Sequence, residues 1–169
     1  MSKSVTITLQ VKELVFDVQN KTYLTGRTHE SVDNAAYESS SHMKASDEEE
    51  DIYQIKRSIS NAFAVLKNHL CEYLVSNTST SDNQLDATVD GDGALVVSLA
   101  MPNNHTTAAV DALGSNMHAY LVDMALAEWF AITSKADSEV YIAQSAIALD
   151  NIKRALYKRS RPDRPTYTS

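Results

Sequence analysis

The sequence has few of the residues that cross-link a chain or break its helices. Among 169 residues there are one Cys, three Pro and four Gly. A single cysteine, Cys71, excludes an internal disulfide and predicts a reducing compartment. The scarcity of Gly and Pro disfavours a fold rich in turns and favours long helices. A chain of this length buries roughly 68–70% of its unfolded surface, so one domain needs no metal to fold.

Long apolar runs are missing as well. No stretch approaches the ~20 apolar residues that a helix needs to cross a bilayer. The first nine residues, from Met1 to Leu9, lack the apolar core of a secretory signal. We therefore expect a protein that is made in the cytosol and has no membrane partner.

Positive charge is in short supply. The chain has 15 Lys and Arg against 22 Asp and Glu, and its formal net charge is −7. Phosphate contacts require clustered cations, so an acidic chain is a poor general binder of nucleic acid. We expect that DNA can pass near this protein without specific binding.

Motifs for metal binding and catalysis are also absent from the sequence. The five histidines form no H-x-x-x-H pair, and Cys71 has no C-x-x-C partner. Neither a glycine-rich phosphate loop nor a G-x-S-x-G motif is present. The sequence predicts no enzyme, no cofactor and no metal, and it predicts that Cys71 is a partly buried structural thiol. The alternative is a small enzyme that uses Glu128 or His118.

Apolar residues recur at helical spacing over most of the chain. Residues 4–11 alternate and predict a strand, whereas the spacing changes to 3–4 from residue 12 onward. Helices are predicted over 12–25, with Gly26 as the C-terminal stop, and over 52–74, 103–133 and 136–158. In the last helix, the predicted inner face is Ile142, Ala146, Leu149, Ile152 and Leu156. The short connection before it predicts antiparallel packing with the helix that precedes it.

Two stretches between these helices are interpreted as irregular or extended. Residues 27–50 are polar and predict a flexible loop, whose acidic run at 47–51 enters the first turn of the next helix. Residues 85–101 predict a β-hairpin whose turn is Asp90, Gly91, Asp92 and Gly93. The predicted fold is mainly α, a single domain over 1–158 built as a bundle of three to four amphipathic helices with this inserted hairpin.

The C-terminal segment 159–169 differs from the body in composition. It carries cations and prolines, namely Arg159, Arg161, Pro162, Arg164 and Pro165. Prolines cannot continue a helix, and a short stiff cationic segment can lie in the groove of a partner. We interpret 159–169 as an extended docking arm. A disordered chain end is the alternative.

Four stretches together are similar to small structural proteins of Bacteroides-type (pro)phages. They span 13–27, 120–130, 148–157 and 161–165. The layout more broadly resembles that of tailed-phage head–tail connector (adaptor or head-completion) proteins, in which a helical bundle carries a β-hairpin and a C-terminal extension.

The resemblance implies a ring, typically of twelve copies, bound below the portal. It implies that the hairpin contacts neighbouring copies or the next ring and that the arm engages the portal. It further implies a location in the cytoplasm of the bacterial host during assembly and then in the virion, and it brings no catalytic residue. Two alternatives remain: another tail-completion or virion protein of the same gene cluster, and a cytosolic helical regulator that binds a partner through the apolar stripe at 52–74.

Overall fold

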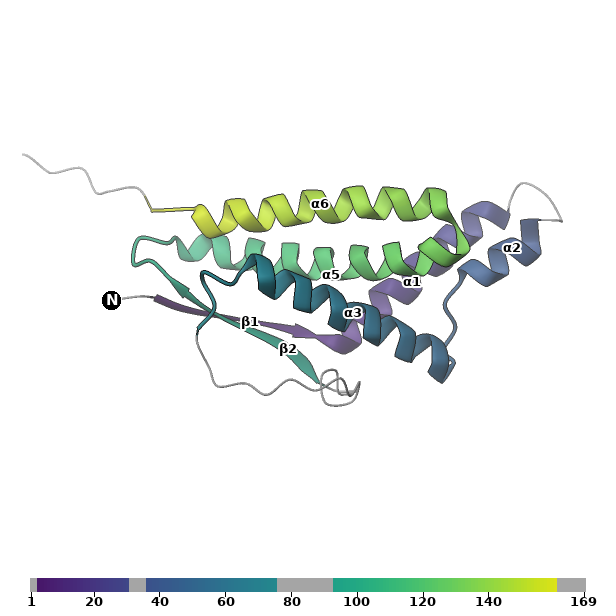
Figure 1. Ribbon diagram of the computed structural model, residues 1–169, viewed down its shortest axis with the longest axis horizontal. Helices are drawn as coiled ribbons and strands as arrows, with labels where there is room; N and C mark the ends of the chain where they lie inside the picture. Colours follow the sequence, from purple (N-terminus) through teal and green to yellow (C-terminus); the bar gives the residue numbers. More distant parts are fainter. Residues whose placement is uncertain (1–2, 31–35, 76–92, 161–169) are drawn as a thin grey trace, which may run out of the picture.

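The helices form a layered bundle that lies on a small sheet (Figure 1). The computed structural model describes residues 3–30, 36–75 and 93–160. In this part of the chain the elements follow the order β1 (Lys3–Gln10), α1 (Val11–Glu30), α2 (Ala36–Met43), α3 (Glu49–His69), β2 (Ala94–Met101), one 3-10 turn (Thr107–Ala109), α5 (Val110–Thr133) and α6 (Lys135–Tyr157). The predicted fold class, a mainly helical bundle with a small antiparallel β element, is confirmed.

The sheet consists of β1 and β2, which pair antiparallel over eight residues each. Alternation places most of the large apolar residues of both strands on one face, with Val96 exposed on the other. The register sets Val5 opposite Leu99, Ile7 opposite Val97 and Leu9 opposite Leu95. All six side chains are buried. The sheet therefore contributes one apolar layer to the core, as the period of two in β1 predicts.

The predicted strand at 94–101 is confirmed, and it pairs with β1. The carbonyl of Gly93 accepts a hydrogen bond from the Val11 N–H at 3.2 Å, which extends the pairing with β1 by one step. At its other edge β2 bonds to Tyr73 and Val75, after the end of α3. Residues 85–89 and the turn residues Asp90, Gly91 and Asp92 lie outside the described residues, so the local hairpin stays a prediction.

The helix with the clearest periodicity in the sequence is α3. Its stripe is buried in the core, including Ile55, Ile59, Phe63 and Leu66. A buried stripe is unavailable to a partner protein, which argues against the regulator that binds through residues 52–74. The helix ends at His69 rather than residue 74, because the chain turns at Leu70 to reach β2. The acidic residues Glu49, Glu50 and Asp51 do occupy its first turn.

The last two helices are antiparallel, as predicted, and Ser134 alone connects them. The predicted inner face of α6 is partly wrong, because Ile142 is 53% exposed. Ala146 is exposed as well, whereas the predicted Ile152 and Leu156 are buried. The other buried residues of α6 are small: Ser138, Ser145, Ala148 and Ala155. The hydroxyl of Ser138 donates to the Ala127 carbonyl at 2.9 Å, so this small polar side chain is satisfied in the contact.

The predicted flexible loop at 27–50 is wrong over most of its length. Helix α1 continues to Glu30, α2 occupies Ala36–Met43 and α3 begins at Glu49. Gly26 is not a C-terminal stop, since it has no positive φ and lies inside α1. Its missing side chain instead lets α2 approach, and a Cβ there would lie 3.0 Å from the Ser40 carbonyl oxygen. The polar composition of this segment predicts a loop, because α2 packs against α1 at a glycine and not through large apolar side chains.

Substituting alanine for each of two helical glycines, Gly26 and Gly114, should therefore change the stability of the protein in opposite directions. At Gly26 a Cβ would meet Lys44 Cγ at 2.8 Å as well as the Ser40 backbone, and overpacking of this kind costs about 1–3 kcal/mol. At Gly114 the nearest atom lies 3.7 Å away, so Gly114→Ala gains about 0.5–1 kcal/mol of helix propensity. Urea denaturation should show Gly26→Ala destabilised and Gly114→Ala stabilised. A stabilised Gly26→Ala protein would contradict the close approach of α2.

Candidate interaction surfaces

Helix α6 lies at one side of the bundle and packs mainly on α5 (Figure 1). Between Ala136 and Ile147 its opposite side is exposed and consists chiefly of apolar or small residues, whereas further along the helix Asp150 and Arg154 are exposed and charged. We define the α6 outward face as Ala136, Glu139, Val140, Ala143, Ala146 and Ile147, all of which are exposed. The Val140 and Ile147 side chains are 52% and 63% exposed. Contiguous exposed apolar side chains are typical of a surface that contacts another protein.

The beginning of the predicted docking arm is held against the body of the protein. Arg159 pairs with His105 in an isolated antiparallel bridge, and Ser160 donates its N–H to the Asn104 carbonyl at 2.8 Å. The Arg159 guanidinium donates to the Leu156 carbonyl at 2.7 Å and so caps the end of α6. Arg159 is thus an anchor, whereas Arg161, Pro162, Arg164 and Pro165 lie outside the described residues.

Aromatic contacts reinforce this anchor. The Tyr73 and Tyr157 rings meet edge to face, with 6.2 Å between their centroids. Burial and then Tyr157 raise the pKa of the Tyr73 phenol, whereas Arg159 lowers it. His105 is 3% exposed, and its Nε2 lies 3.1 Å from the Ala155 carbonyl oxygen. These contacts fix Ser160, the last described residue, beside the start of α5.

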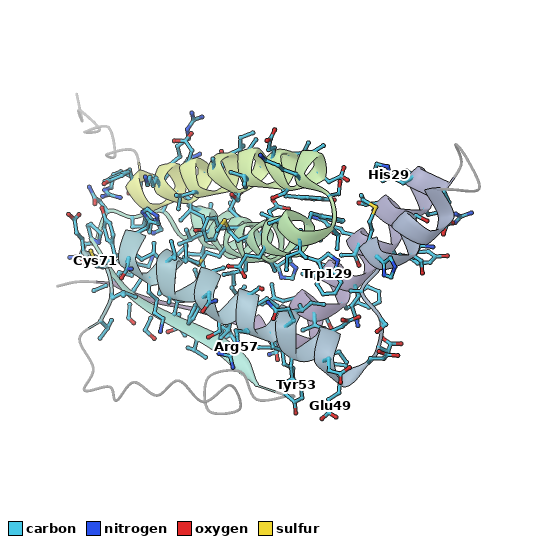
Figure 2. All side chains as sticks on the ribbon, turned by 45° about the vertical axis from the view of Figure 1, so that its right-hand side comes forward. His29, Glu49, Tyr53, Arg57, Cys71 and Trp129 are labelled. Atoms are coloured by element: carbon cyan, nitrogen blue, oxygen red, sulfur yellow. The ribbon has the colours of Figure 1, made fainter. Side chains whose placement is uncertain are left out.

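A cleft of about 550 Å³ opens at the opposite end of α5, between α2 and the beginning of α3. We call it the Trp129 cleft; its lining residues on α5 are Glu128, Trp129, Ile132 and Thr133. The Trp129 Nε1–H donates to the Met43 carbonyl at 2.9 Å, which fixes the indole against the end of α2. Figure 2 shows Trp129 between the helices, with Cys71 labelled at the far end of the molecule.

Negative charge predominates around the Trp129 cleft. Glu48, Asp51 and Glu128 line it together with one lysine, Lys44, which is already paired with Glu30. Asp51 is engaged as well, since its Oδ2 accepts from the backbone and the hydroxyl of Ser46. Within the part of the chain that the structure describes, Glu48 and Glu128 have no ion-pair partner, so they are available to a cationic ligand.

A second, more open groove of about 530 Å³ runs between β1 and the first half of α5. Its lining includes Thr6, Thr8, Ser115 and His118. The His118 Nε2 lies 2.7 Å from the Asp17 carboxylate, which orients the imidazole. This groove brings hydroxyls and one oriented histidine together.

The two residues of the enzyme alternative do not share a site. His118 lies in the groove beside β1, whereas Glu128 lies in the Trp129 cleft, ten residues or about 15 Å further along α5. Cys71 is exposed, so the predicted partly buried thiol is wrong. Cys71 lies just after α3, where the chain turns toward the sheet. Helical periodicity no longer applies there, so it does not predict whether the thiol is buried. Among the described residues, no group of three His, Cys, Asp or Glu side chains is placed to hold a metal ion.

Comparison with known proteins finds no relative. No family model, curated protein or solved structure matches the chain. In the described ranges, none of the helices is both long enough and apolar enough to cross a bilayer. The function must therefore be argued from the surfaces themselves.

The sequence contains only weak signals for these surfaces. Val140 and Ile147 are apolar at a spacing of seven, which indicates one helix face but not whether that face is covered. The Trp129 cleft is built from three elements, and one of them, α2, falls in the predicted loop. The sole tryptophan of the chain was the available signal for the cleft.

Proposed function

We propose that this chain is a non-catalytic structural protein that forms part of a phage head–tail connector ring below the portal. The observation that carries this proposal is the α6 outward face. The helix is packed on one side only, and its other side exposes Val140 and Ile147 between alanines that allow a second element to approach closely. A second copy of this chain is the occupant that we propose for the face.

Charge is compatible with a position around DNA. The chain has a net charge of −7, and a channel lined by its acidic residues would repel phosphate and let DNA pass without being held. A ring of more than two copies further requires contacts between unlike surfaces of neighbouring copies, which meet head to tail around the ring. The chain offers several separate surfaces for such contacts, among them the α6 outward face, the arm and the Trp129 cleft. In this proposal the protein is made in the cytoplasm of the bacterial host and then enters the virion.

Native mass spectrometry of the full-length protein, alone and with the portal protein of the same gene cluster, tests the proposal. We expect either a ring, an oligomer that grows with concentration, or a monomer that assembles only on the portal. Cryo-electron microscopy of the complex then counts the copies, for which twelve is the expectation. A protein that associates neither with itself nor with any virion component would contradict the proposal.

The His118–Asp17 pair favours one rival function, a hydrolytic enzyme that uses an oriented imidazole as a base. The variant His118→Gln, which lies outside the Trp129 cleft, tests it in a phage-production assay. We expect production to be unchanged. Loss of production, with the fold and the assembly of the variant intact, would favour the enzyme.

A further inference from the structure

We propose that the C-terminal arm of one copy docks in the Trp129 cleft of the next copy. This inference rests on the proposed function and specifies one of its head-to-tail contacts. It combines three observations: the chemistry of the cleft, the sequence of the arm and the distance between them.

The cleft has both an apolar and an anionic part. Trp129 is partly exposed there, and Ile132, at its margin, is 86% exposed. The carboxylates of Glu48 and Glu128 lie in the same cleft. An indole packs well against proline rings and against guanidinium groups, and carboxylates bind guanidinium groups through charge-assisted hydrogen bonds. The fitting ligand is an extended segment that contains both proline and arginine.

The arm has this composition at a matching period. Arg161 and Arg164 are three residues apart, and each is followed by a proline, Pro162 or Pro165. A residue before proline favours extended backbone. A polyproline II segment has three residues per turn, so in that conformation both arginines would share one face and both prolines another. Such a segment would present guanidinium groups to the carboxylates and proline rings to Trp129.

The distance requires that the contact join two copies. Ser160 is the last described residue before the arginines of the arm, and it bonds to Asn104 before the start of α5. From Val110 to Glu128, α5 advances by about 27 Å. Four residues of fully extended chain, from Ser160 to Arg164, span at most about 14 Å. Arg161, one residue after Ser160, and Arg164 therefore cannot both reach the cleft of their own copy. Ser160 and the Trp129 cleft lie toward opposite ends of α5, so a contact between the arm of one copy and the cleft of another is head to tail.

Charge reversal on each side provides the test, with full-length protein throughout. One variant is Glu128→Arg, and the other is Arg161→Glu combined with Arg164→Glu. We expect each variant alone to associate at least tenfold more weakly than the wild type in sedimentation velocity. We expect a mixture of the two to regain association, because each arm then meets a cleft of opposite charge. The matched control is Glu13→Arg, which makes the same charge change at an exposed carboxylate outside the cleft.

Trp129 supplies an independent readout, because it is the only tryptophan of the chain. Its emission should shift as the wild type associates and again in the mixture, but not in either reversed variant alone. Unchanged association of the Arg161→Glu, Arg164→Glu variant, or a mixture that fails to recover, overturns the inference. If that variant forms normal rings but no longer binds the portal, the arm docks on the portal; the inference is then wrong while the proposed function stands. A wild-type protein that binds neither itself nor the portal overturns both.

Discussion

Leu66→Asp should leave the protein largely unfolded. Leu66 has no exposed surface, and it lies on α3 in the middle of the shared core. Losing the leucine side chain alone costs about 2–5 kcal/mol, and an unpaired buried carboxylate adds several more. Small domains are stable by only about 5–15 kcal/mol, so the variant loses most or all of its stability. Far-UV circular dichroism and urea denaturation measure the loss.

Val65→Asp is the matched control for this prediction. Val65 is the preceding residue of the same helix and is 41% exposed, so the same carboxylate stays in water. We expect a change within about 1 kcal/mol, because exposed substitutions are rarely costly. A Leu66→Asp variant that unfolds at the urea concentration of the wild type would show that α3 is not part of the core.

Ile147→Arg should weaken association through α6 at least tenfold while the subunit stays folded. The isoleucine is 63% exposed in the isolated chain, so a charge there costs the monomer about 0.5 kcal/mol or less. In a contact between copies the arginine would lose its hydration against alanines. The association constant should therefore fall at least tenfold, which corresponds to about 1.4 kcal/mol. Sedimentation velocity and co-assembly with the portal measure this loss, and thermal denaturation measures the fold.

Gln144→Arg serves as the control on the same helix. Gln144 is exposed but lies about 100° around the helix from Ala143, at the margin of the α6 outward face. We expect nearly normal association from this variant. Equal behaviour of the two arginine variants would place the contact elsewhere, and normal assembly of Ile147→Arg would remove the main support for the proposed function.

Much of the fold could be predicted because its signals are local. The stripe of α3 and the alternation of β1 are periodic over several turns or residues, and burial follows directly from that periodicity. The pairing of β1 with β2 is different, since it joins segments that lie more than 80 residues apart in the chain. Nothing in either strand specifies the other, and the turn residues at 90–93 favoured a local partner instead.

The structure differs from the sequence prediction at α2, where a loop is predicted, and at α6, whose buried face is rotated from the predicted one. Both differences have the same physical reason. Both helices pack through small residues, Gly26 beside α2 and the row Ser138, Ser145, Ala148 on α6. A search for large apolar residues overlooks such contacts, because close approach replaces side-chain volume. The Trp129 cleft was missed as a consequence, since α2 forms one of its walls.

The direct junction between β1 and α1 has a consequence for folding accuracy. Gln10 ends the strand and Val11 begins the helix, with no loop residue between them. A slip of one residue in the strand would move Val5, Ile7 and Leu9 to the outer face of the sheet. The same slip would turn α1 by about 100° and expose Leu14 and Val18, which are now fully buried. Each shifted register would thus expose apolar residues of both β1 and α1. The direct junction therefore raises the free energy of misaligned sheets and favours the native register.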